Sequence, residues 1–132
     1  MARILVIDDE SLVRTFLRDV LEGAGHEVRE GANGDEAIAA FAEFKPDILI
    51  VDLIMPEQDG LFVIREVRRS MPEAKVIAIS GMHSVAGFDY LKPAVKLGAD
   101  LALYKPFSPK DLLKAIANLL PAADHGGRAS QG

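Results

Sequence analysis

Hydrophobic and polar positions switch between two periods along the chain. Short apolar runs, typical of strands buried on both faces, are followed by stretches in which apolar residues recur at helical spacing. Five strands are predicted in this way, over Ile4–Ile7, His26–Glu30, Asp47–Asp52, Lys75–Ile79 and Leu101–Tyr104. The second of these runs is more polar than the others, which indicates a strand at an edge of the sheet.

Helical spacing fills the intervals between these strands. The first predicted helix has Ser11 as its N-cap and stops at Gly23 or Gly25, and its apolar positions are Leu12, Phe16, Leu17, Val20 and Leu21. Further helices are predicted over Asp35–Phe44, from Leu61 to Arg69 after a loop, over Pro93–Leu97, and from Pro109 after Ser108 to Leu120. The fourth helix is thus expected to be late and short.

Regular alternation of strands and helices predicts the fold class. Connections between parallel strands are right-handed, so five strand–helix units give an α/β protein with a parallel sheet covered by helices on both faces, a three-layer sandwich. A chain of 132 residues is the size of one domain. We expect this domain to span residues 1–121 and the small, polar residues 122–132 to form a flexible tail.

Composition and charge exclude several classes of protein. The chain has no cysteine, which rules out disulfide scaffolds and thiolate metal sites. Its net charge is -5 and its basic residues are scattered, so a nucleic-acid partner is not expected. The densest basic group, Arg65, Arg68 and Arg69, fits an exposed helix face. The N-terminal apolar run covers only Ile4–Ile7, so we expect a cytoplasmic protein without a signal peptide or a membrane partner.

Polar residues end or directly follow four of the predicted strands. They are Asp8, Asp9, Asp52, Ser80 and Lys105. A single Asp in such a place is more often a helix cap or a turn residue. Ligands of open α/β sheets, however, bind outside the carboxyl ends of the strands, where these side chains would converge. Their order along strands one, three, four and five therefore predicts a site.

The chemistry of these side chains is consistent with a magnesium-dependent phosphoryl acceptor. Close carboxylates repel by about 4 kcal/mol per pair at an effective dielectric constant near 20, so three of them require a cation. Oxygen ligands select a hard ion, and Mg²⁺ is the usual one. A carboxylate beside Mg²⁺ can attack a phosphoryl group, while the Lys105 ammonium and the Ser80 hydroxyl can bind its oxygens.

From about Arg3 to Leu120 the chain strongly resembles the response-regulator receiver domain of two-component signalling. The matching segments are residues 4–10 (ILVIDDE), 32–34 (ANG), 46–47 (PD), 52–56 (DLIMP), 59–60 (DG), 79–81 (ISG), 97–100 (LGAD) and 105–107 (KPF). The resemblance implies a flavodoxin-like receiver fold, with strand order 2-1-3-4-5 and five flanking helices.

The same resemblance implies a role for each residue of the site. Asp52 would accept the phosphoryl group of a histidine kinase or phosphotransfer protein. Asp9, Asp52 and the backbone carbonyl of Ile54 would ligate Mg²⁺ directly, and Asp8 would act through water. Ser80 and Lys105 would bind phosphoryl oxygens, and the Lys105–Pro106 peptide bond would be cis.

Two departures from the family pattern concern how the effect of phosphorylation would be transmitted to the protein surface. Receivers usually carry Tyr or Phe three residues before the lysine, where this chain has Ala102, and Tyr104 lies one residue before it instead. The segment from Ser80 to Gly98 is also a few residues longer than usual. Both departures predict an altered switching mechanism and output face.

Ile54 and Met82, each two residues beyond a residue of the site, leave two interpretations open. Their apolar side chains either hinder a hydrolytic water and prolong the life of the phosphorylated state, or simply pack the loops.

The resulting functional prediction is a stand-alone response regulator that switches the binding of a downstream protein target. It would not be a classical enzyme, although Mg²⁺-dependent self-phosphorylation and slow autodephosphorylation are expected, and it would be a monomer or a weak dimer. The alternative is a degenerate receiver acting as a phosphorylation-independent adaptor, which Ala102 mildly favours. An aspartate-dependent phosphatase is excluded because such enzymes need a second Asp where this chain has Ile54.

Overall fold

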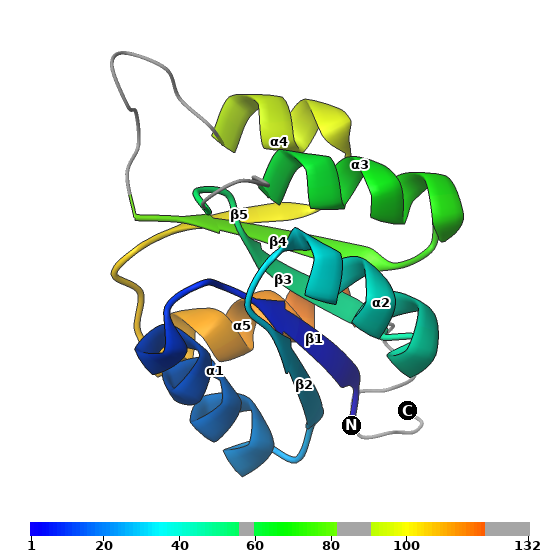
Figure 1. The fold of residues 1–132 in the computed structure, drawn as a ribbon. Coiled ribbons are helices and arrows are strands. Elements are labelled where there is room, and N and C mark those ends of the chain that lie inside the picture. The colour runs from blue at the N-terminus through cyan, green and yellow to red at the C-terminus, as the bar shows by residue number, and fades with distance from the viewer. Residues whose placement is uncertain (56–59, 82–90, 121–132) are drawn as a thin grey trace.

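The computed structural model describes residues 1–55, 60–81 and 91–120, which form a parallel five-stranded sheet flanked by five helices (Figure 1). The strands are β1 (Arg3–Ile7), β2 (Glu27–Gly31), β3 (Ile48–Asp52), β4 (Lys75–Ser80) and β5 (Leu101–Tyr104). The helices are α1 (Ser11–Gly23), α2 (Gly34–Phe44), α3 (Gly60–Ser70), α4 (Leu91–Leu97) and α5 (Pro109–Leu119). The strand order β2-β1-β3-β4-β5 confirms the predicted α/β fold and its order 2-1-3-4-5.

The sheet separates two hydrophobic cores. Successive side chains of a strand point to opposite faces, so Ile4 and Val6 of β1 pack with α1 and α5, whereas Leu5 and Ile7 pack with α2, α3 and α4. The same division holds for β3, in which all five residues are buried. Figure 1 shows α2, α3 and α4 on one side of the sheet and α1 on the other. The central strands need continuous apolar runs because both of their faces are covered.

The beginning of α1 differs from the sequence prediction in two respects. Glu10, not Ser11, is the N-cap of α1, and no side chain caps the helix. The side chain of Asp8 instead accepts a hydrogen bond from the Glu10 N–H at 2.9 Å, so the turn closes before the helix begins. Leu12 was predicted on the apolar face but is 83% exposed. At 100° per residue it lies far around the helix from the buried Leu17.

The basic group on α3 is only partly an exposed face. Arg65 and Arg69 are exposed as predicted, but the prediction was wrong for Arg68. The Arg68 guanidinium forms an ion pair with Asp100 at 2.6 Å and donates hydrogen bonds to three backbone carbonyls, including that of Gly98. A planar group with five N–H donors can satisfy several carbonyl groups at once, and Arg68 thereby joins α3 to the end of α4.

The helices agree closely with the sequence prediction, although α4 begins at Leu91, two residues before the predicted start at Pro93. α4 is late and short, with 7 residues, and Ser108 caps α5 through a capping box with Asp111 directly before Pro109. Among the ranges that the structure describes, no helix is long and apolar enough to cross a membrane. Met82 and the predicted tail, residues 122–132, lie outside these ranges, so the domain boundary remains a prediction.

Gly60 begins α3 in direct contact with the end of β3. A Cβ atom at this position would lie 2.3 Å from the carbonyl oxygen of Asp52 and 2.9 Å from Cα of Leu53. Both atoms belong to the backbone and cannot move aside without shifting the strand end that carries Asp52. Only glycine therefore allows α3 to start this close to β3.

Substituting Gly60 with Ala is expected to lower the free energy of unfolding by about 1–3 kcal/mol, because the methyl group overpacks a backbone contact. Gly23→Ala is the matched control, since a Cβ atom there meets nothing within 4 Å. It should leave stability unchanged or raise it slightly, because Ala is the better helix former. Urea denaturation followed by circular dichroism measures both variants, and equal stabilities would contradict the close contact.

Candidate functional site

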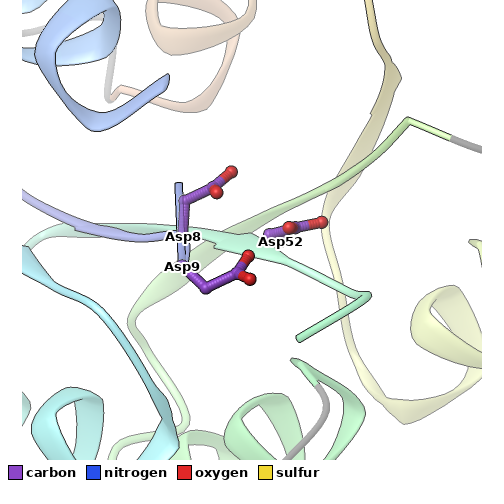
Figure 2. Close-up of side chains that lie close together, drawn as sticks. All are labelled: Asp8, Asp9 and Asp52. Carbon is purple, nitrogen blue, oxygen red and sulfur yellow. The ribbon is translucent and has the colours of Figure 1, made fainter. Parts of the chain in front are cut away.

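Three carboxylates meet at the carboxyl end of the sheet. Asp8 and Asp9 directly follow β1, and Asp52 is the last residue of β3 (Figure 2). The final register pair between these adjacent strands is Ile7 with Val51, so an acidic residue comes next after each of them. One oxygen from each carboxylate lies within 4.8 Å of the others. The structure thus brings together the three acids that the sequence placed at the strand ends.

Asp8 is fully buried, and each of its polar groups has a partner. Its N–H donates to the carbonyl oxygen of Gly31 at 3.2 Å, and its carboxylate accepts from the Glu10 N–H and, at 3.0 Å, from the Lys105 ammonium. Burial raises the pKa of the Asp8 carboxyl, although the Glu10 N–H and Lys105 act in the opposite direction. Asp9 is exposed, so it offers its carboxylate to an incoming ion or ligand.

Asp52 is buried next to this pair. Its Oδ1 accepts a hydrogen bond from the Ile54 N–H at 3.2 Å, and its Oδ2 lies 3.8 Å from Nζ of Lys105. Burial and the negative charge of Asp8 raise the pKa of Asp52 to about 6, against the opposing effect of Lys105. Because the ionised form of this carboxylate is destabilised, any cation that enters the site will stabilise it.

Lys105 follows β5 and reaches across the strand ends to the carboxylates. Its ammonium lies 3.0 Å from Asp8 and 3.6 Å from Glu10. Burial opposes the charge of Lys105, but Asp52 and Asp8 outweigh it and raise the pKa of the ammonium. The Lys105–Pro106 peptide bond is cis, as the resemblance implied.

Ser80 occupies the matching position on β4. It is the buried last residue of that strand, and its carbonyl accepts the Lys105 N–H at 2.8 Å. In the register of β3 with β4, Asp52 pairs with Ile79, so Ser80 lies one residue beyond it. The predicted residues at the ends of β1, β3, β4 and β5 therefore lie at one edge of the sheet.

The donor set fits a hard divalent cation. Within the described residues, three carboxylates lie together and Lys105 is the cation that contacts them, so negative charge is in excess. Carboxylate oxygens in this number suit Mg²⁺. The predicted role of the Ile54 carbonyl stays a prediction. The Ile54 side chain is half-buried against the core under α3, which favours the packing interpretation of this residue, and Met82 lies outside the described residues.

Two residues near the site were missed by the sequence analysis. Glu10 lies next to the acid pair, and its place in the run Asp-Asp-Glu was the available signal. Arg14 donates a hydrogen bond to the backbone carbonyl of Asp8 at 2.7 Å. No sequence signal identifies this contact, because it joins a helix side chain to a backbone oxygen.

The comparisons with known proteins agree with one another. A family model described as the response regulator receiver domain matches residues 4–117. A chemotaxis protein CheY of Thermotoga maritima is 38% identical over 115 residues, which cover 86% of this chain and 93% of that protein.

Solved structures show the same fold. A CheY-like receiver domain protein from Methanospirillum hungatei superposes with a TM-score of 0.85 at 26% identity, covering 96% of this chain and 99% of the other. Chemotaxis protein CheY4 of Vibrio cholerae gives a TM-score of 0.83 at 30% identity, covering 91% and 99% of the two chains.

The raised pKa of Asp52 predicts how the metal-free protein responds to pH. Between the ordinary value of 3.8 and about 6, the unfolded carboxyl is ionised while the folded one still holds its proton. The folded state therefore binds more protons, and the free energy of unfolding should fall as the pH rises through this range. The loss amounts to about 2–3 kcal/mol, since each pKa unit corresponds to roughly 1.4 kcal/mol.

Asp52→Asn should abolish this loss, so in the presence of a chelator it should be more stable than the wild type near neutral pH and equally stable near pH 4. Asp19→Asn, at an exposed position of α1, is the control and should follow the wild-type curve. Urea denaturation at a series of pH values measures all three proteins. A curve for Asp52→Asn that runs parallel to the wild type would contradict the prediction.

Proposed function

Because the chain belongs to the response regulator receiver domain family, we propose that it is a signalling switch phosphorylated on Asp52. The convergence of Asp8, Asp9, Asp52 and Lys105 at one sheet edge is the observation that supports this function. Receiver domains are signalling proteins, and CheY-like receivers interact with histidine kinases or phosphotransfer proteins and with downstream targets. We propose partners of these classes for this chain.

The proposed reaction needs the groups of this edge, a bound Mg²⁺ and a phosphodonor. An Oδ atom of Asp52 forms a bond to the phosphorus of a phosphohistidine while the bond from phosphorus to the imidazole nitrogen breaks. The electron pair of that bond stays on the imidazole, which takes up a proton, and the product is an acyl phosphate on Asp52. Lys105 is already 3.8 Å from Asp52 and can pair with an oxygen of the transferred group.

Asp9 and Asp52 are proposed to hold Mg²⁺, with Asp8 beside them. When bound, the ion would supply positive charge to the oxygens of the transferred group. Asp8 keeps Lys105 at the edge of the site through their 3.0 Å contact. Ser80, buried at the end of β4, is proposed to donate its hydroxyl to the phosphoryl group.

Phosphorylation would change the surface through the charge it adds. A phosphoryl group brings about -1.5 to -2 charge and three strong acceptor oxygens to this edge. Ala102 lies half-buried on the side of the sheet covered by α4, where it contributes a methyl group to the core. The family's inward-turning aromatic is thus replaced by a small side chain, and we propose that the switch of this protein works without it.

The adaptor alternative is not favoured. A binding module that never carries a phosphoryl group would gain nothing from three carboxylates held within 4.8 Å, whose repulsion costs stability. A surface that only binds a partner would be more stable with neutral side chains at these positions.

Incubation with acetyl phosphate and Mg²⁺, followed by intact-protein mass measurement, tests the proposal. One phosphoryl adduct is expected on the wild type and on Asp19→Asn, and none on Asp52→Asn, because an amide cannot form the acyl phosphate. Omitting Mg²⁺ should reduce the adduct strongly. An adduct of undiminished amount on Asp52→Asn would place the acceptor elsewhere, and a wild type that never gains the adduct would support the adaptor.

A further inference from the structure

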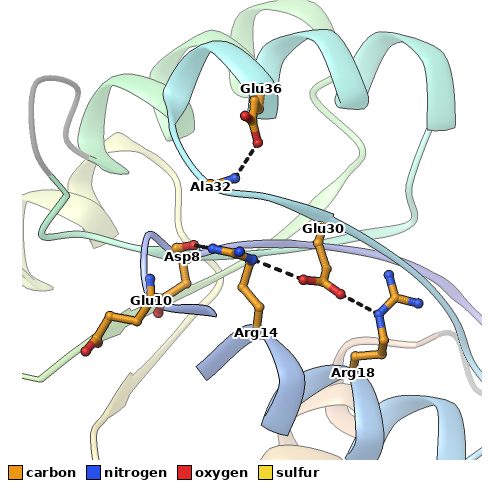
Figure 3. Close-up of polar contacts among 7 residues, drawn as sticks. All are labelled: Asp8, Glu10, Arg14, Arg18, Glu30, Ala32 and Glu36. Atoms are coloured by element: carbon orange, nitrogen blue, oxygen red, sulfur yellow. Dashed lines mark hydrogen bonds and ion pairs between the residues drawn. The ribbon is translucent and has the colours of Figure 1, made fainter. Parts of the chain in front are cut away.

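The side chain of Arg14 bridges the acid pair and the neighbouring strand. From the first turn of α1, its Nη1 donates to the carbonyl oxygen of Asp8 at 2.7 Å, and its Nε donates to Glu30 of β2 at 3.0 Å (Figure 3). The Arg14 side chain is only 18% exposed, so solvent screens these contacts weakly. Arg14 touches no carboxylate of the site, and the proposed phosphotransfer gives it no role.

The backbone around Asp8 has left the sheet and needs other anchors. β1 ends at Ile7, and both backbone groups of Asp8 are tied to β2 instead. The N–H donates directly to Gly31, and the carbonyl is held through Arg14 by Glu30. The carbonyl of Asp8 and the N–H of Asp9 belong to one planar peptide unit. Fixing that carbonyl therefore also fixes the direction in which Asp9 leaves the strand.

We propose that Arg14 is a positioning residue, which orients the Asp8–Asp9 peptide so that the Asp9 carboxylate faces Asp52 and a divalent cation. This inference rests on the proposed function, because it concerns the same metal site. Partners that orient metal ligands are typically worth 10- to 100-fold in affinity, which makes the contribution of Arg14 measurable.

Arg14 can donate to the Asp8 carbonyl and to Glu30 at the same time because of the geometry of its guanidinium group. Its Nε and Nη1 point in fixed, different directions, one toward the strand and one toward the loop. A lysine carries its charge at a single atom, so it can replace one contact well but not both. Arg14→Lys should consequently recover only part of the function of arginine at this position.

Arg18 provides a matched control. It lies one turn further along α1, pairs with the other oxygen of Glu30 and also pairs with Glu22 at 2.7 Å. The Arg18 guanidinium, followed by that of Arg14, holds the pKa of the Glu30 carboxyl below its usual value. Both arginines therefore join α1 to β2 through the same carboxylate, but of these two only Arg14 also donates a hydrogen bond to the backbone of Asp8.

The experiment compares Arg14→Met, Arg14→Lys and Arg18→Met, in which methionine keeps an apolar stem. Isothermal titration calorimetry with MgCl₂ gives the Mg²⁺ affinity, and urea denaturation with a chelator gives the stability of the metal-free protein. Arg14→Met should bind Mg²⁺ about tenfold more weakly, Arg14→Lys should fall in between, and Arg18→Met should bind like the wild type. The amide NMR signal of Asp9 in the metal-free protein should move in Arg14→Met and not in Arg18→Met.

The outcomes separate this inference from the proposed function. If the wild type and Arg14→Met bind Mg²⁺ equally, or if both methionine variants lose affinity in proportion to lost stability, Arg14 only joins α1 to β2 and the inference is overturned. If the wild type itself binds no Mg²⁺, the proposed metal site fails and the inference fails with it. Should Arg14→Met not fold, the Mg²⁺ affinity of Arg14→Lys and the Asp9 amide signal of that variant still decide the question.

Discussion

The register of the parallel strands is the constraint on which the site depends. Ile7 pairs with Val51, Asp52 with Ile79, and Ser80 with Tyr104, so each strand reaches its polar residue within one step of the same edge. A shift of one residue in any strand would turn its apolar side chains to the other face and remove its polar residue from the edge. The two hydrophobic cores, one on each face of the sheet, hold this register and thereby the spacing of the carboxylates.

The buried carboxylates of the site lower the stability of the fold. Burial raises the pKa of the Asp8 and Asp52 carboxyls, the charge of Asp8 raises that of Asp52 further, and Lys105 offsets only part of these effects. Such local destabilisation is typical of functional sites, because a group that is poorly satisfied alone interacts strongly with its ligand. Gly60 adds a second requirement, since α3 can start against the carbonyl of Asp52 only without a side chain.

Most of the fold could be predicted from the sequence because its strands are apolar runs and its helices have clear apolar faces. The boundaries of the five strands were predicted to within one residue, and the polar residues at their ends were identified because each follows such a run. Three of the differences have a common physical cause, because they involve side chains bonded to backbone groups. Asp8 closes the turn that Ser11 was expected to cap, and Arg68 bonds carbonyls where a solvated side chain was expected. Arg14, which bonds the carbonyl of Asp8, was not considered for the same reason. Periodicity reports which face of an element is buried, but it contains no information about contacts of this kind.

The central claim is that the edge formed by Asp8, Asp9, Asp52 and Lys105 is one site, which holds a divalent cation and a phosphoryl group together. A crystal structure with Mg²⁺ and beryllofluoride, which mimics a phosphoryl group on a carboxylate, tests it directly. The account predicts beryllofluoride on Asp52, with Lys105 beside its fluorine atoms and Mg²⁺ coordinated by Asp9 and Asp52. A metal ion bound away from these carboxylates, or beryllofluoride on any other side chain, would contradict it.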